Sequence, residues 1–167
     1  PGPQPLAPFF VGRGHCIEHY GPSEAYMPVL TALGRLCRES DGKQLLKLLR
    51  RYAPTWLVQL PALLGASVRE RLEQETYGAT RGRMLREIAE VIEAITETRA
   101  LILWIDDLHW SDTSTLDLLS FLAPRREQAR FLIIGTYRPG DILGGGHPLR
   151  AIVQELTAHK QCSELQV

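Results

Sequence analysis

The sequence predicts an α/β fold in which helices cover both faces of a parallel sheet. Residues 101–106 and 130–139 each contain an uninterrupted apolar run that ends in polar residues. Such runs are typical of parallel strands buried on both faces. Between them, residues 116–123 have leucines spaced as on one side of a helix, and Pro124 ends or bends that helix. A strand, a helix and a strand in succession predict a right-handed parallel crossover.

The N-terminal part is predicted to contain one strand and one helix. Residues 9–17 form a short strand, in which glycines permit close approach of a neighbouring segment. A helix then starts from Ser23 as its N-cap, has Pro28 in or near its first turn, and ends at residues 40–42. Its apolar side is formed by Val29, Leu30, Leu33, Leu36 and Cys37.

The middle of the chain is predicted to be helical. Residues 45–49 form a short amphipathic helix, and the prolines of residues 53–64 keep that stretch irregular or in short helices. Residues 69–75 are densely charged, which is typical of a solvated helical face. Residues 80–96 give the clearest helix. Its buried stripe consists of Met84, Leu85, Ile88, Val91, Ile92 and Ile95.

The two ends are less regular. Residues 1–8 form a proline-rich leader, and with no initial methionine they suggest a fragment of a longer protein. Near the C-terminus, residues 144–146 are predicted to be a glycine loop and residues 149–156 a helix. Residues 162–167 are a possible last strand.

Composition excludes several classes of function. The 167 residues fit one domain, with 44% hydrophobic and 23% charged residues. Lysine plus arginine and aspartate plus glutamate both number 19, so no net charge attracts nucleic acid or an anionic membrane. No apolar run is long enough to cross a bilayer, and the start does not resemble a signal peptide. A cytoplasmic location is the default expectation.

The cysteines predict reduced thiols and offer little support for a metal site. Cys16, Cys37 and Cys162 are odd in number and far apart, which argues against a disulfide framework. Cys16 lies between His15 and His19, the only cluster of soft ligands, but no second ligand pair accompanies it. We therefore expect Cys16 to pack in a strand.

The most informative feature is the acidic end of the strand at residues 101–106. Asp106 and Asp107 follow its apolar run directly, and ligands of parallel sheets bind at the carboxyl ends of the strands. In P-loop nucleotidases, acids at this place hold Mg²⁺ and polarise the attacking water, so the pattern matches a Walker B strand. The alternative is that the two acids begin a turn before a helix capped by Ser111 or Asp112. That alternative leaves two charges at a buried strand end unexplained.

Five phrases of the sequence occur together and in order, at residues 14–21, 24–30, 83–87, 106–112 and 135–139. Together they resemble the bacterial AAA-type ATPase domain of the signal-transducing STAND class, which occurs in large regulators beside helical repeats and DNA-binding or cyclase modules. The similarity covers about residues 9–167, and the acidic run is its most specific part. The resemblance implies a three-layer, P-loop NTPase-like fold, in which helices cover both faces of a parallel sheet. It also implies that the complete domain binds ATP and Mg²⁺.

The resemblance also assigns site residues. Asp106 matches the Walker B acid that is associated with Mg²⁺, and this acid also counts as catalytic. Asp107 matches the catalytic acid that polarises the attacking water. Arg138 matches the arginine that senses nucleotide phosphate, for which its forked guanidinium is suited, and Thr136 would help to position that site. The alternative for Arg138 is a surface ion pair with an acid. His109 fits the family pattern as a packing and orienting residue.

No Walker A sequence, GxxxxGK[ST], occurs in the 167 residues. The nearest match, Gly42-Lys43-Gln44, lacks the first glycine and the serine or threonine. The family places this loop and its strand before the segment similar to this chain, in the centre of the sheet. We therefore expect the first strand to be missing and this chain alone to bind ATP weakly or not at all. The unpaired edge of the strand at residues 130–139 would then permit self-association.

Three functions follow as hypotheses. The first is part of an ATP-binding and ATP-hydrolysing switch domain, whose nucleotide state controls the other domains of a regulator. The second is a non-catalytic scaffold or protein-interaction domain that retains the fold without the nucleotide chemistry. The third, direct nucleic-acid binding, is disfavoured because the chain has no basic helix or patch.

Overall fold

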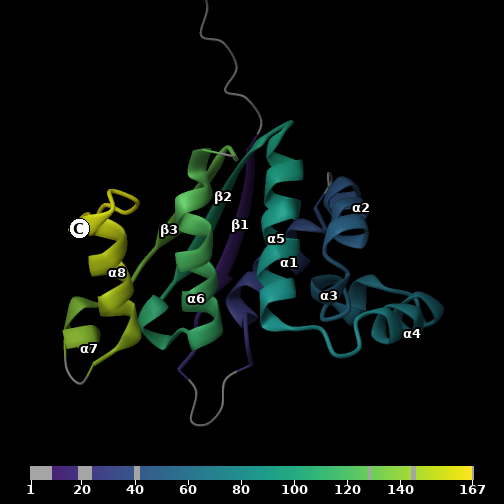
Figure 1. The fold of residues 1–167 in the computed structure, drawn as a ribbon, viewed down its shortest axis with the longest axis horizontal. Helices are drawn as coiled ribbons and strands as arrows, with labels where there is room; N and C mark the ends of the chain where they lie inside the picture. Colours follow the sequence, from purple (N-terminus) through teal and green to yellow (C-terminus); the bar gives the residue numbers. More distant parts are fainter. Residues whose placement is uncertain (1–8, 19–23, 40–41, 128, 144–145, 167) are drawn as a thin grey trace, which may run out of the picture.

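A three-stranded parallel sheet forms the centre of the computed structural model, which describes residues 9–18, 24–39, 42–127, 129–143 and 146–166. The strands are β1 (Phe9–His15), β2 (Ala100–Asp106) and β3 (Phe131–Gly135), in the order β1-β2-β3. Figure 1 shows them side by side with helices packed against them. The predicted α/β class and its parallel sheet are confirmed.

The register of the sheet brings the carboxyl ends of its strands together. His15 pairs with Asp106 across β1 and β2, and Ile105 pairs with Gly135 across β2 and β3. The ladder continues past β1, where the Cys16 amide donates to the Asp106 carbonyl at 2.9 Å. Polar residues that follow strands far apart in the sequence therefore meet at one edge of the sheet.

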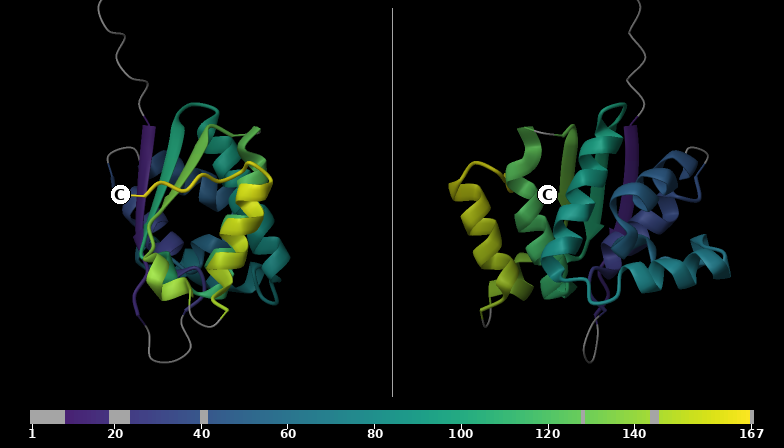
Figure 2. Two further views of the ribbon diagram at one scale, coloured as in Figure 1. Left: turned by 90° about the vertical axis from the view of Figure 1, so that its left-hand side faces the viewer. Right: turned by 45° about the vertical axis from the view of Figure 1, so that its right-hand side comes forward.

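Helices α1 (Met27–Leu36), α5 (Arg81–Thr96) and α6 (Thr113–Leu122) lie on the same side of the sheet (Figure 2, left). The β2 side chains on the covered face, at alternate positions, are buried: Leu101, Leu103 and Ile105. The covered face also includes Gly12 of β1, where an added Cβ would lie 3.1 Å from the Leu36 side chain. This close packing of helix and sheet forms the hydrophobic core.

The opposite face of the sheet is only partly covered by the described residues. Ile102 and Trp104 of β2 are half-buried, whereas Phe9 and Leu132 are 50% and 52% exposed. The described helices lie to one side in Figure 2, so burial alternates along β2 where the sequence predicted burial on both faces. β3 likewise has no fully buried residue, because among the described residues it pairs only with β2.

Helix α1 starts later than predicted. It begins at Met27 and has Pro28 in its first turn, while the predicted cap, Ser23, lies outside the described residues. A proline lacks the amide hydrogen that an interior helical position needs, so the helix starts just before it. Tyr26 precedes the helix in the left-handed conformation, with φ 61°. The first turn packs tightly on β1, since a Cβ at Gly14 would lie 2.2 Å from the Pro28 carbonyl oxygen.

Helix α1 also ends earlier than predicted, at Leu36 with Cys37 as its C-cap. Gly42 begins the next helix, α2 (Gly42–Tyr52), instead of ending the first. The turn requires glycine there, because a Cβ would lie 2.2 Å from the Cys37 carbonyl oxygen. Residues 40–41 lie outside the described residues.

The other helical predictions of the middle region are confirmed. The proline-containing stretch forms two short helices, α3 (Pro54–Leu57) and η1 (Pro61–Leu63). The charged stretch lies in α4 (Ala66–Glu75), a helix described over its whole length, in which Leu72 alone is buried. Thr80 caps α5, and its side chain accepts a hydrogen bond from the Arg83 amide.

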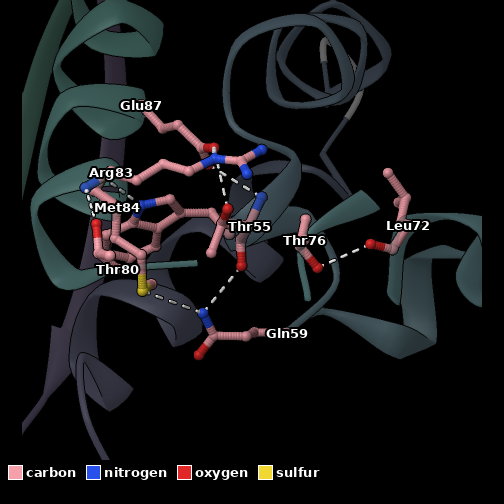
Figure 3. A network of polar contacts seen from close by, with 9 residues as sticks. Thr55, Gln59, Leu72, Thr76, Thr80, Arg83, Met84 and Glu87 are labelled. Atoms are coloured by element: carbon pink, nitrogen blue, oxygen red, sulfur yellow. Dashed lines mark hydrogen bonds and ion pairs between the residues drawn. The ribbon is translucent and has the colours of Figure 1, made fainter. Parts of the chain in front are cut away.

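A buried carboxylate joins the short helix α3 to α5, one of the helices that cover the sheet (Figure 3). Glu87 of α5 accepts hydrogen bonds from the amide and the hydroxyl of Thr55 in α3, both at 3.0 Å. Arg83, one turn earlier, donates to the same carboxylate at 2.7 Å. The indole of Trp56 adds a hydrogen bond to the Met84 carbonyl at 2.8 Å. These contacts fix α3 against α5, because the Glu87 carboxylate and its donor Thr55 are both buried.

Asp112 connects the starts of two helices. Its Oδ1 accepts hydrogen bonds from the Thr115 amide at 2.9 Å and from the Tyr26 amide at 3.3 Å. Its Oδ2 accepts a hydrogen bond from the Thr115 hydroxyl at 2.6 Å. Asp112, one of the two predicted candidates, is therefore the N-cap of α6. The hydroxyl of the other candidate, Ser111, donates to the Asp112 carbonyl at 3.4 Å and is not the cap.

We predict that Asp112→Ala lowers the free energy of unfolding by about 2 kcal/mol, because it removes a helix cap and leaves the buried Thr115 hydroxyl without an acceptor. Denaturant unfolding followed by circular dichroism measures this change. Ser111→Ala is the matched control and is expected to cost less than about 0.5 kcal/mol. Equal effects of the two substitutions would contradict the assignment of the cap to Asp112.

The C-terminal region contains η3 (Ala123–Glu127), α7 (Pro139–Leu143) and α8 (Pro148–Ala158). The predicted helix at residues 149–156 is confirmed within α8, whereas most of the predicted glycine loop lies outside the described residues. The possible last strand is wrong for residues 162–166, which have no regular structure. Leu165, the leucine of this segment, is 88% exposed and does not pack on the sheet.

The described helices are all too short or too polar to span a lipid bilayer.

Candidate functional site

The acidic strand end is the centre of the candidate site. The Oδ1 atom of Asp106 accepts hydrogen bonds from the Trp104 indole at 2.7 Å and from the Thr136 hydroxyl at 3.0 Å. No described residue donates a hydrogen bond to Oδ2. The carboxylate is therefore held in one orientation by one oxygen, and the other oxygen remains available to a ligand.

Thr136, directly after β3, orders the loop that carries both acids. Its hydroxyl donates to Asp106 and accepts from the Asp107 amide at 3.1 Å. Its backbone amide donates to the Ile105 carbonyl at 3.0 Å, and its carbonyl accepts from the Leu108 amide at 2.8 Å. Thr136 thus contacts the chain on both sides of the acidic pair.

Asp107 turns the chain out of the sheet. It has a left-handed backbone with φ 58° and ψ 47°, a conformation that aspartate tolerates better than most residues. The turn leads into η2 (Leu108–Trp110). The Asp107 carboxylate lies 3.6 Å from the His15 imidazole and 4.0 Å from the His109 imidazole. It is 33% exposed, so water reaches it.

Arg138 lies at the same edge of the sheet, two residues after Thr136. Its side chain is exposed, and in the described part of the chain no group forms a hydrogen bond or an ion pair with its guanidinium. The alternative of an ion pair with a nearby acid has no support among these residues. The backbone of Arg138 is held by its amide, which donates to His109 Nδ1 at 3.4 Å.

Two contributors to the site were not identified from the sequence. Trp104 lies two residues before Asp106, and this spacing in a strand places both side chains on the same face. That signal is present in the sequence, although indole donors rarely mark a functional site. His15 comes from β1, and only the register of β1 against β2 brings it to Asp107.

The residues fit a magnesium site that is completed by other ligands. Mg²⁺ prefers six oxygens, usually one or two carboxylates with phosphate oxygens and waters. Asp106 offers its Oδ2 atom, while its Oδ1 atom is held by the Thr136 hydroxyl. Asp107 follows directly in the chain, and its amide donates to the same hydroxyl. The described residues contain no group of three or more histidine, cysteine, aspartate or glutamate side chains that could hold a metal ion alone.

The thiol beside the site does not suit a soft metal. Cys16 is buried, as expected, although it lies one residue past the end of β1 and not in the strand. Burial raises the pKa of its thiol to about 11, with nearby carboxylates adding to the effect. The thiol therefore stays protonated near neutral pH and is a poor ligand. His19, the other predicted neighbour, lies outside the described residues.

Comparison with known proteins identifies the family. A family model described as AAA ATPase domain matches residues 5–134, which is most of the chain. The match includes β1, β2 and all of β3 except its last residue. No curated protein and no solved structure is significantly similar to the chain. The matched residues contain the acidic end of β2 and most of the sheet that positions it. The chain therefore belongs to the AAA ATPase domain family.

Proposed function

We propose that the carboxyl edge of the sheet binds ATP with Mg²⁺ and hydrolyses it, and that the nucleotide state acts as a switch in a bacterial STAND-class regulator. The observation that carries the proposal is the state of Asp106. One of its oxygens is held by Trp104 and Thr136, and the other has no donor among the described residues. A carboxylate fixed in this way is preorganised to bind a cation.

Asp106 would hold Mg²⁺ through Oδ2, directly or through water. The bound ion would neutralise charge on the phosphate oxygens and orient them. Thr136 keeps the carboxylate in place, because its hydroxyl is committed to Oδ1. Asp106 is therefore assigned to metal binding in the proposed reaction.

Asp107 would polarise the water that attacks the γ-phosphorus. Its carboxylate is partly exposed, and its amide is tied to Thr136, so it adjoins the metal-binding acid at a fixed position. It would accept a proton as the water oxygen forms its bond to phosphorus and the bond to ADP breaks. Arg138, with its guanidinium exposed at the same edge, would bind a phosphate oxygen through its forked donors.

The phosphate cradle would come from a Walker A loop outside these 167 residues, which contain no GxxxxGK[ST] sequence. Such a loop would bring a strand to the outer edge of β3 and a helix to the open face of the sheet. Changes in that region on hydrolysis would be passed to other domains of the parent protein, which by resemblance are helical repeats and a DNA-binding or cyclase module.

The test is equilibrium binding of ATP with Mg²⁺ to this chain and to a longer version that includes the preceding residues of the parent protein. We expect binding only by the longer version, weakened at least about tenfold by Asp106→Ala. Asp117→Ala is the matched control, because it changes another aspartate, one that pairs with Arg81 on the surface of α6. It should leave ATP binding unchanged.

A longer version that neither binds nor hydrolyses ATP would overturn the switch proposal. The acids would then be structural, and the domain would be a scaffold that retains the AAA fold. Equal loss of binding in Asp106→Ala and Asp117→Ala would also count against a specific metal-binding role for Asp106.

A further inference from the structure

His109 contacts four separate parts of the site from a buried position, since its side chain is only 1% exposed. Its Nδ1 atom accepts a hydrogen bond from the Arg138 amide at 3.4 Å. Its Nε2 atom lies 3.4 Å from the Asp141 carboxylate and 4.0 Å from the Asp107 carboxylate. Its carbonyl is 3.0 Å from the Nε2 atom of His147. One residue of η2 therefore connects the acidic loop, the segment after β3, α7 and the start of α8.

The contact with Arg138 determines where the imidazole proton lies. An amide can donate only to a ring nitrogen with a free lone pair, so Nδ1 is unprotonated and Nε2 carries the hydrogen. The same reasoning applies to His147, whose Nδ1 accepts from the Leu149 amide and whose Nε2 therefore donates to the His109 carbonyl. These contacts fix the orientation of the His109 residue on both sides.

The Nε2–H of His109 faces two carboxylates and has no well-aligned hydrogen bond to either one among the described residues. A buried N–H without an acceptor is unfavourable, so the donor is drawn toward one of the two acids. Asp141 is the nearer one, and it lies on α7, two residues after Pro139. A bond to Asp141 would leave the Oδ1 atom of Asp107, which faces the ring, without a hydrogen bond from His109. Loss of Asp141 would make this oxygen the remaining acceptor.

We propose that Asp141 and His109 form a positioning pair for Asp107, in which Asp141 holds the imidazole N–H and so keeps the Asp107 carboxylate available for water. The pair also fixes the spacing between the acidic loop and the Arg138 segment, because both contact the same ring. This role deepens the proposed function and depends on it for the part played by Asp107. Asp141 then becomes a residue of the site through His109, since in the described part of the chain no hydrogen bond or ion pair joins it to Asp106.

The first test is NMR of the histidine ring nitrogens and backbone amides in this chain. In the unaltered chain, the proton of His109 should be on Nε2. Asp141→Ala should shift the His109 ring signals and the Asp107 and Arg138 amide signals, and Asp141→Asn should largely restore them, since its amide oxygen can still accept. The Asp141 side chain is 44% exposed, so its replacement should leave the melting temperature nearly unchanged.

Glu155→Ala is the matched control, because it removes an exposed acid of α8 whose carboxylate makes no hydrogen bond or ion pair in the described part of the chain. It should shift none of these signals. The pairing is overturned if the His109 proton is on Nδ1, or if Asp141→Ala leaves the ring and the Asp107 amide unchanged. Shifts of the same size in the Glu155→Ala control overturn it as well.

The second test is steady-state ATP hydrolysis by the longer version. Asp141→Ala should lower kcat about tenfold with KM nearly unchanged, and Asp141→Asn should recover most of the loss. An unchanged kcat would overturn the positioning role even if the NMR signals shift. If the longer version hydrolyses no ATP at all, the proposed function and the positioning role fail together, while the NMR measurement still decides whether Asp141 and His109 pair.

Discussion

Asp107→Asn is expected to lower the kcat for ATP hydrolysis by about 100-fold or more in a version of the protein that includes the Walker A loop. The asparagine side chain has nearly the same size, but it cannot accept a proton from the attacking water. Asparagine also tolerates the left-handed backbone of this position, where φ is 58°. The change therefore removes the proposed chemistry and preserves the turn. Steady-state hydrolysis measures kcat, and equilibrium binding shows whether ATP is still held.

Asp117→Asn is the matched control for this prediction. It makes the same chemical change at an aspartate that pairs with Arg81 on the protein surface, and it should leave kcat within about twofold of the original value. If Asp107→Asn keeps kcat within about threefold, Asp107 is not the water-polarising residue. Binding that falls together with kcat would instead assign Asp107 to the metal site beside Asp106.

Glu87→Ala is expected to lower the free energy of unfolding by about 3 kcal/mol. The carboxylate accepts three hydrogen bonds, two from Thr55 and one from Arg83. Both Glu87 and Thr55 are buried, so water does not readily replace the lost acceptor. The charge of Arg83 loses its partner at the same time. Denaturant unfolding gives the free energy, and Figure 3 shows the contacts that are removed.

Two further variants separate this network from a general effect on α5. Glu90 lies three residues after Glu87, on the exposed side of the same helix. Glu90→Ala should change the free energy of unfolding by less than about 0.5 kcal/mol. Glu87→Gln retains one acceptor oxygen and should cost less than Glu87→Ala. A network that stabilises α3 requires this order of effects, and equal losses for Glu87→Ala and Glu90→Ala would contradict it.

The sequence by itself predicted the class of fold and the location of the acidic pair. The apolar runs of β2 and β3 and the stripe of α5 depend on neighbouring residues with a regular period, which a single sequence shows directly. Asp112 could be recognised as a candidate cap for the same reason, since capping depends on residues three positions apart. The contrary example is the segment at residues 162–166, where a short mixed pattern suggested a strand without indicating what it would pair with.

Only the tertiary structure decided how the site is arranged. Thr136 reaches Asp106 across 30 positions of the sequence, and Glu87 reaches Thr55 across 32. Such contacts depend on strand register and helix packing, which no local pattern encodes. The left-handed turn at Asp107 and the placement of His15 and His109 beside its carboxylate have the same origin. The local pattern thus placed the two acids at the end of a buried strand. Packing between distant segments determined which oxygen of Asp106 is held and which is left for a ligand.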